Sequence, residues 1–253
     1  MTLAEHSADE WFVSTVPRPD ATVSAVAFPH AGGGCSAFAM HARAMPAWLR
    51  VMTVNLPGRQ ARFGEPLRTD IGELTQELTE SWAGHPEPCL FFGYCSGAML
   101  AYCVVRGLQE RGAPLPRRLV VGGYPAPHLN LSTVTLADLD SENLWKVLIR
   151  NQAIPPHLGA HSELRKLAEP VIRADLALVA GYRHTPAPPL PIPITVLIGS
   201  RDVSLRPEAV TGWADYTTQQ LQIRRLPTGH WFMEEDPAAA TAALVSEAAD
   251  VRP

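Results

Sequence analysis

The fold of this chain is decided by the stretch Leu90-Phe91-Phe92-Gly93-Tyr94-Cys95-Ser96-Gly97-Ala98-Met99-Leu100. Residues 89–92 are apolar throughout, which is typical of a parallel strand buried on both faces. Residues 98–108 have an apolar helical pattern. Gly93 and Gly97 bracket the turn between them, where a larger side chain would clash with the strand or the helix. The central residue, Cys95, is therefore pushed out above the sheet at the positive end of a helix.

This order of strand, G-x-X-x-G turn and helix is the nucleophile elbow of an α/β-hydrolase. Cys95 occupies the nucleophile position, where serine is usual, and Ser96 stands one residue too late to take that role. The alternative is a buried structural cysteine in an ordinary β–α turn, since cysteine is often buried. Both glycines, with the strand before and the helix after, favour the catalytic interpretation.

The composition is that of a globular protein. The 253 residues, 46% hydrophobic and 18% charged, suffice to bury a sizeable core. The net charge of −4 gives no reason to expect nucleic acid or an anionic membrane as partner. No apolar run is long enough for a membrane span, and no secretory signal pattern opens the sequence. We therefore expect a cytoplasmic protein whose four cysteines are free thiols without metal spacing.

Short apolar runs alternate with helical patterns along the chain, which predicts a mostly parallel sheet with helices on both faces. The predicted strands cover residues 22–28, 50–56, 89–92, 119–123, 194–198 and 221–226. We predict one α/β-hydrolase domain over residues 1–253, with a helical lid inserted at about 128–186. The alternative for this insertion is a set of surface helices filling a long crossover. Helices are expected over 141–151 and 162–182, the second broken or kinked at Pro170.

A nucleophile of this kind needs a general base and a group that orients the base. In α/β-hydrolases the chain order is nucleophile, acid, histidine. Asp202 follows the strand 194–198 and His230 follows the last strand, so both lie on loops at the edge where ligands bind. The rival acids are Asp215, expected to be a solvated helix residue, and Asp236, expected to begin the C-terminal helix.

The oxyanion hole should combine the N–H after the nucleophile with one from a loop that follows an early strand. The first donor is Ser96. The second is Ala31 or Gly32, in a glycine-rich loop that lacks the features of a phosphate or dinucleotide loop. His30 precedes both acid and nucleophile and is expected to be structural. Four other histidines are expected at the surface or in the lid: His41, His85, His157 and His184.

With these residues in hand, the chain resembles the type II thioesterases of nonribosomal peptide and polyketide synthases nearly from end to end. The motifs that carry the resemblance are Phe28-Pro29-His30-Ala31-Gly32-Gly33, Leu56-Pro57-Gly58-Arg59, Arg62-Phe63-Gly64-Glu65-Pro66, Phe91-Phe92-Gly93, Gly97-Ala98, Pro155-Pro156, Ile172-Arg173-Ala174-Asp175-Leu176-Ala177-Leu178, Gly199, Asp202, Trp213 and Gly229-His230. The resemblance implies hydrolysis of acyl groups from the phosphopantetheine arm of an acyl or peptidyl carrier protein, with no cofactor. We expect no metal and a monomer.

The chain departs from this family at the elbow, where the usual G-H-S-M-G reads Gly93-Tyr94-Cys95-Ser96-Gly97. A cysteine receives the acyl group as a thioester, close in energy to the pantetheine thioester that donated it. Two outcomes follow: a thioesterase that releases free acid, or a shuttle that passes an acyl or aminoacyl group between two carriers, as some relatives with cysteine here do. The alternative of a cysteine introduced in place of serine stays open, although Tyr94 and Ser96 favour a natural residue.

Two further interpretations use the same fold differently. One is a small-molecule ester or lactone hydrolase, which needs no carrier protein. The other is an inactive hydrolase fold that serves as a binding module. The mechanism we expect is ping-pong, with Cys95 as nucleophile, His230 as base and Asp202 as the group that orients His230.

Overall fold

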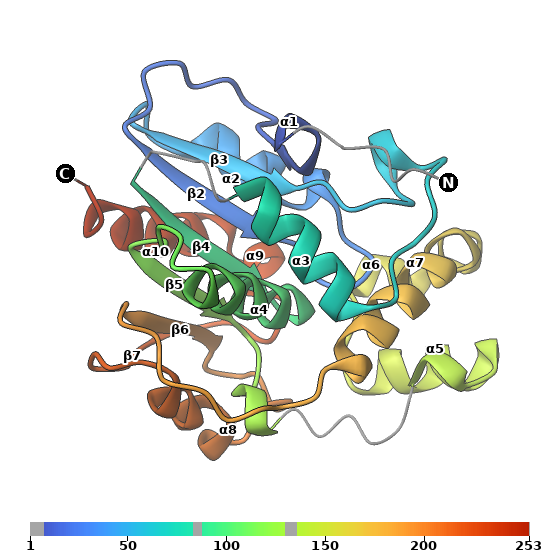
Figure 1. Cartoon of the computed structure of the whole chain (residues 1–253). Coiled ribbons are helices and arrows are strands. Elements are labelled where there is room, and N and C mark those ends of the chain that lie inside the picture. Colours follow the sequence, from blue (N-terminus) through green and yellow to red (C-terminus); the bar gives the residue numbers. More distant parts are fainter. Residues whose placement is uncertain (1–7, 83–87, 130–135, 253) are drawn as a thin grey trace, which may run out of the picture.

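A seven-stranded sheet runs through the computed structural model, which describes residues 8–82, 88–129 and 136–252 (Figure 1). Its strands are β1 (Phe12–Val13), β2 (Val23–Phe28), β3 (Leu49–Val54), β4 (Cys89–Tyr94), β5 (Arg118–Gly122), β6 (Ile194–Gly199) and β7 (Gln222–Leu226). They lie in the order β1-β3-β2-β4-β5-β6-β7, with β1 antiparallel to β3 and every other neighbouring pair parallel. This confirms the predicted α/β-hydrolase fold. The two-residue strand β1 is the one that sequence analysis missed.

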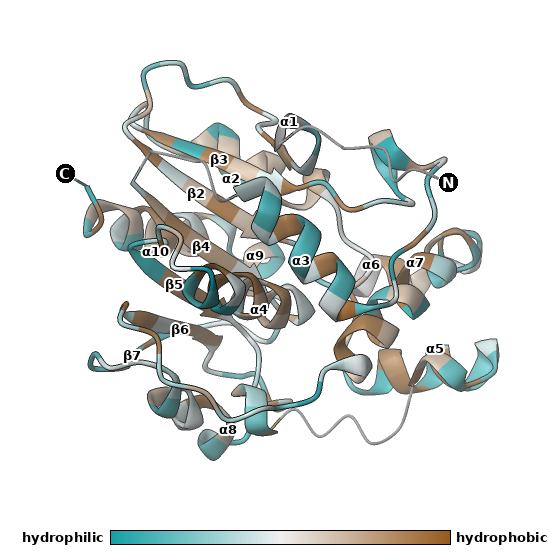
Figure 2. Cartoon of the chain, in the orientation of Figure 1, coloured by the Kyte–Doolittle hydropathy of each residue, from teal (hydrophilic) through white to brown (hydrophobic). Residues whose placement is uncertain are grey.

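Successive side chains of the central strands enter two different cores because a strand alternates its faces. In β4, Phe91 packs into one apolar cluster, whereas Leu90 and Phe92 pack into the other. The first cluster is completed by α3 (Ile71–Trp82) and α4 (Ser96–Glu110). The second is completed by α2 (Ala39–Ala44), α9 (Phe232–Glu235) and α10 (Pro237–Ala249). Figure 2 shows the hydrophobic central strands β2, β4 and β6, and the alternation of hydrophobic and hydrophilic residues along α3.

The remaining described elements add fewer side chains to these two clusters. They are α1 (Ala8–Trp11), α5 (Ser141–Arg150), α6 (Pro156–Ala160), α7 (Ser162–Gly181), α8 (Pro207–Thr211) and the 3-10 turns Cys35–Phe38, Gln60–Arg62, Pro127–Leu129, Leu136–Asp138 and Gly212–Tyr216. None of the helices in the described ranges is long and apolar enough to cross a membrane.

The segment expected as a lid, residues 128–186, connects β5 to β6 and contains α5, α6 and α7, which gather on one side of the molecule (Figure 1). These helices share a small apolar core of their own, formed by Leu144, Trp145, Leu148, Ile154 and Ile172. Helix α7 is continuous through Pro170, so the predicted break is wrong, and the alternative of a kink stays a prediction. A proline removes one i→i−4 hydrogen bond, and the buried side chains of Ile172, Ala174 and Leu178 hold the helix beyond it.

Candidate active site

The turn between β4 and α4 has the geometry of a nucleophile elbow. Cys95 stands between the last strand residue and the first helix residue with φ 51° and ψ −128°, a backbone conformation that is strained for a residue with a side chain. Its N–H donates to the carbonyl of Gly122 at 2.7 Å. A Cβ on Gly93 would lie 2.3 Å from Ala98 Cα, and one on Gly97 would lie 2.2 Å from the Phe28 carbonyl oxygen. Both glycines are therefore required by sterics, as the sequence predicted.

The structure brings the predicted base and acid together beside this elbow. His230 Nδ1 lies 2.7 Å from Asp202 Oδ2, and their side chains are 8% and 3% exposed. The thiol of Cys95 lies close enough to His230 to help raise the pKa of its imidazole. The three side chains come from the loops after β4, β6 and β7, which meet at one edge because those strands are parallel. They form a contiguous chain of nucleophile, base and acid.

The electrostatics of this chain favour a charged imidazole. Burial disfavours the imidazolium, but the interactions with Asp202 and Cys95 outweigh it and raise the pKa of His230 to about 10. Burial also opposes ionisation of Asp202, yet the hydrogen bonds from His230 and Ser204 outweigh it and hold the pKa of that carboxyl below its usual value. An ordinary thiol has a pKa of about 8.5, so such a histidine is basic enough to take a proton from a thiol.

Ser204 is a member of this site that sequence analysis missed. Its N–H and hydroxyl donate to Asp202 Oδ1 at 2.8 and 2.6 Å. Because Oδ1 is held in this way, Oδ2 is left facing His230. The pattern Asp-x-Ser after a strand is a known signature of such a side-chain turn and could have indicated this contact.

Among the described residues, the N–H groups of Ser96 and Ala31 have no hydrogen-bond partner and are the candidates for an oxyanion hole. Ser96 opens α4, so its N–H is one of the unpaired donors of the first helical turn. The N–H of Ala31 has no hydrogen bond to any residue of the described ranges. The N–H of Gly32, by contrast, donates to Asp175 Oδ2 at 2.8 Å. Gly32 is therefore not available as a donor in this structure, which corrects one of the two alternatives drawn from the sequence and leaves Ala31.

The thioesterase domain family matches residues 25–248. The chain belongs to this family. It is 31% identical over 227 residues to the human medium-chain S-acyl fatty acid synthase thioesterase, covering 87% of this chain and 84% of that protein. Among solved structures, RedJ, a thioesterase of the prodiginine pathway of Streptomyces coelicolor, is similar with 33% identity, a TM-score of 0.83 and coverage of 91% and 87%. BorB, the type II thioesterase of the borrelidin cluster, is similar with 29% identity, a TM-score of 0.85 and coverage of 95% and 98%.

The resemblance to type II thioesterases of nonribosomal peptide and polyketide pathways is thereby confirmed, and the chain is an enzyme of the thioesterase class. The chemistry of a cysteine at the elbow depends on the residues around it in this thioesterase.

Tyr94 fills the position before the nucleophile and braces the histidine loop. Its hydroxyl lies 3.1 Å from the carbonyl oxygen of His230 and 3.2 Å from Glu234 Oε2. Its ring lies nearly parallel to two imidazoles, with centroids 5.7 Å from that of His30 and 6.5 Å from that of His230. Burial raises the pKa of Glu234, so a hydroxyl donor beside this carboxylate offsets part of its desolvation.

His30 of the thioesterase is a buried neutral residue, as expected. Burial and the neighbouring charges of His230 and Arg59 lower the pKa of His30 to about 3. Its ring also packs against Trp231, with centroids 5.0 Å apart. Its Nδ1 has no hydrogen-bond partner among the described residues, so this side chain lies outside the proton path from Cys95 to Asp202.

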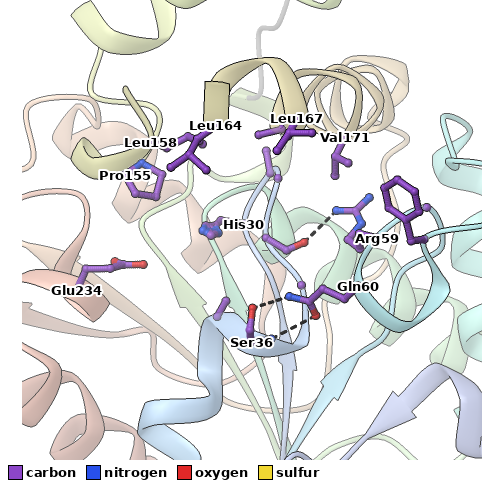
Figure 3. A pocket seen from close by; sticks show the side chains of 18 residues that line it. His30, Ser36, Arg59, Gln60, Pro155, Leu158, Leu164, Leu167, Val171 and Glu234 are labelled. Atoms are coloured by element: carbon purple, nitrogen blue, oxygen red, sulfur yellow. Dashed lines mark hydrogen bonds between the residues drawn. The ribbon is translucent and has the colours of Figure 1, made fainter. Parts of the chain in front are cut away.

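A groove lies between the glycine-rich loop and the lid helices, with a volume of about 730 Å³. Figure 3 shows apolar side chains of the lid facing polar side chains of the core across it. The lid wall includes Pro155, Leu158, Leu164, Leu167 and Val171, and the core wall includes His30, Ser36, Arg59 and Gln60. An apolar wall facing a few polar groups is typical of a site for a small organic ligand.

The rival acids lie where the sequence predicted. Asp215 is exposed in the turn Gly212–Tyr216, and Asp236 caps α10 by accepting the N–H of Ala239 at 3.0 Å. The carboxylate that contacts His230 among the described residues is that of Asp202.

Among the other histidines, the expectation for His41 is wrong. His41 is 3% exposed and its Nδ1 lies 2.8 Å from Thr241 Oγ1, because α2 packs on α10 and turns this face inward. His184 is exposed, as predicted. His85 and the side chain of His157 lie outside the described part of the chain.

All four cysteines are free, as predicted. The described residues contain no group of three or more His, Cys, Asp and Glu side chains that could hold a metal ion.

Proposed function

We propose that this thioesterase removes acyl or aminoacyl groups from the phosphopantetheine arm of carrier proteins through a covalent intermediate on Cys95. The observation that carries the proposal is the strained elbow at Cys95, with its thiol against the buried His230–Asp202 pair. Serine and cysteine enzymes of unrelated folds use the same arrangement of nucleophile, base and acid. The similar synthase-associated thioesterases support a carrier-bound thioester as the substrate class.

The first half-reaction transfers the acyl group to the enzyme. His230 takes the proton of the Cys95 thiol, and the thiolate attacks the thioester carbonyl. The oxygen of the tetrahedral intermediate accepts hydrogen bonds from the N–H groups of Ser96 and Ala31. The carbon–sulfur bond to pantetheine breaks, and His230 returns the proton to the departing pantetheine thiol. No metal or resident cofactor takes part in this scheme, because the arm of the carrier brings the activated acyl group.

The second half-reaction empties the enzyme. His230 removes a proton from water, which attacks the Cys95 thioester through a second tetrahedral intermediate in the same oxyanion hole. The carbon–sulfur bond to Cys95 then breaks, His230 returns the proton to the sulfur, and the products are the free acid and the Cys95 thiol. Asp202, held by Ser204, keeps the imidazole in the orientation that both steps need.

A second function is supported by the identity of the nucleophile. An acyl group on Cys95 remains a thioester, so its transfer to another pantetheine thiol has a reaction free energy close to zero. The enzyme would then move an acyl or aminoacyl group between two carriers. Cys95→Ser should slow this transfer more than hydrolysis, because the serine ester lies lower in energy than the thioester.

The test begins with intact-mass analysis after mixing the protein with acyl- and aminoacyl-carrier proteins. Wild type, Cys35→Ala, Cys89→Ala and Cys103→Ala should gain the mass of the acyl group, whereas Cys95→Ala should not. The three other cysteines are matched controls for nonspecific acylation. An adduct on Cys95→Ala would remove Cys95 as the nucleophile.

The second stage follows a labelled acyl group after a second holo-carrier protein is added. Label in the free acid alone, at every carrier concentration, supports a plain thioesterase, and label on the second carrier supports the shuttle. Equal use of acyl-pantetheine and acyl-carrier would instead favour a small-molecule hydrolase. No acylation and no selective reaction of Cys95 with iodoacetamide would favour a binding module. The predicted monomeric state and cytoplasmic location await their own measurements.

A further inference from the structure

A lid residue reaches into the loop that carries the proposed oxyanion donor. Asp175, on α7, accepts the N–H of Gly32 through Oδ2 at 2.8 Å. The same carboxylate receives two bonds from Arg59, with Nη1 2.6 Å from Oδ2 and Nη2 2.8 Å from Oδ1. Arg59 Nη1 also donates to the carbonyl of Gly33 at 3.0 Å. The pair therefore holds the backbone of two consecutive residues directly after Ala31.

The loop that contains Gly32 is also packed closely against helix α7. Gly32 has φ +78°, and a Cβ placed on it would lie 2.7 Å from Ile172 Cγ1 of α7. Glycine thus allows both the left-handed backbone and the close approach of the lid helix. Ile172 and Asp175 lie on one face of α7, three residues apart, and both contact the loop.

Stability alone is a weak explanation for this ion pair. The side chains of Arg59 and Asp175 are 7% and 6% exposed, so both charges have lost most of their water. Such a pair is often no more stable than well-packed apolar residues of similar size. Its distinctive property here is geometric, since a bidentate guanidinium and a carboxylate fix a plane and a distance. Arg59 also neutralises a carboxylate that would otherwise repel a developing oxyanion.

We infer that Arg59 and Asp175 are positioning residues that hold the Ala31 N–H in the oxyanion hole, so that lid helix α7 is part of the catalytic apparatus. The inference rests on the proposed function, because the oxyanion is that of thioester cleavage. Donors stabilise the transition state to the extent that they are fixed beforehand, and loss of one donor lowers turnover by roughly 100- to 1,000-fold. Loosening the loop should cause a smaller loss, of about 10- to 100-fold.

The test compares two reactions of the same thiol. Acylation of Cys95 by an acyl-carrier thioester passes through an oxyanion, whereas alkylation by iodoacetamide needs the thiolate but forms no oxyanion. Arg59→Met, Asp175→Leu and the double variant should acylate about 10- to 100-fold more slowly than wild type, with the double variant no slower than the singles because the pair acts as a unit. Their alkylation rates should stay within about twofold of wild type, since the proton path from Cys95 to Asp202 is untouched.

Stability is measured in parallel by urea denaturation. Each single variant leaves a buried charge unpaired and should be strongly destabilised, whereas the double variant should recover much of the loss. Its acylation should not recover, which a purely structural role could not explain. Asp175→Asn, which keeps an acceptor for the Gly32 N–H, serves where a single variant fails to fold, and its acylation should fall less than that of Asp175→Leu.

The matched control is another buried ion pair, Arg118–Glu247, with a distance of 2.7 Å and side chains 7% and 0% exposed. Arg118 opens β5, at the opposite end of the strands from Cys95. Glu247→Gln should lower stability but leave acylation per folded molecule unchanged. Acylation within twofold of wild type in folded Asp175→Leu, or equal losses of acylation and alkylation, would overturn the inference. Wild type that alkylates at Cys95 but takes no acyl group from any thioester would instead refute the proposed function.

Discussion

The strained backbone at Cys95 leads to a prediction about stability. Cys95 has φ 51° and ψ −128°, and such a conformation costs a residue with a side chain about 1–3 kcal/mol. Glycine adopts it freely, but its unfolded chain gains freedom worth about 0.4–1 kcal/mol. Cys95→Ala keeps the strain and Cys95→Gly relieves it, and both remove the sulfur. The free energy of unfolding of Cys95→Gly should therefore exceed that of Cys95→Ala by about 1 kcal/mol, within a range of roughly 0 to 2.5 kcal/mol.

Urea denaturation at pH 7 measures this difference, with both variants inactive, so that catalysis does not enter. Cys103 supplies the control because it lies inside α4. There alanine is the better helix former, and Cys103→Gly should be about 1 kcal/mol less stable than Cys103→Ala. If glycine is more stable than alanine at position 95 but less stable at position 103, the result supports backbone strain at the elbow. If Cys95→Gly is also less stable than Cys95→Ala by about 1 kcal/mol, the strain assigned to this turn is wrong.

Three further predictions concern the histidine loop and the lid. Folding raises the pKa of His230 to about 10, so its contribution to stability is complete below about pH 6.5 and disappears as the pH rises through about 10. The urea midpoint of Asp202→Asn should therefore fall furthest below that of wild type near pH 6. A difference between the two midpoints that is as large at about pH 10.5 as at pH 6 would contradict this. Tyr94→Phe removes the hydroxyl beside Glu234 and His230 and should lower stability by about 1–2 kcal/mol while alkylation of Cys95 persists; unchanged stability would refute the bracing role. Residues 128–186 should exchange amide hydrogens faster than β6, except in the buried part of α7 around Ile172 and Leu178, and uniformly slow exchange would show a rigid insertion.

The elbow could be predicted from sequence because its constraints are local. Gly93 and Gly97 stand where a Cβ would meet backbone atoms at 2.3 and 2.2 Å, and no rearrangement of distant residues relieves such a clash. The order of Cys95, Asp202 and His230 was predictable for a related reason. Parallel strands place their carboxyl ends at one edge, so residues directly after three strands meet there whatever the length of chain between them.

Contacts that depend on how two helices pack could not be predicted in the same way. His41 has the sequence context of a surface helix, and its burial follows from the approach of α10, 200 residues later in the chain. Asp175 is similar, since it reads as one polar residue of an amphipathic helix and finds Arg59 across 116 residues. A motif search marks both members of that pair without indicating that they touch.

The part of the chain that packs as a separate lid is shorter than the insertion predicted from the sequence. Its length and position between β5 and β6 predicted an insertion over residues 128–186, which suggests a unit that moves as a whole. In the structure, Leu178 belongs to the core cluster that contains α4, whereas Ile172 belongs to the small core of the lid. Helix α7 thus spans both, and its buried half contacts the glycine-rich loop at Gly32. A motion that opens the groove without breaking these contacts has to take place on the side of Pro170 that holds α5, α6 and the first two turns of α7.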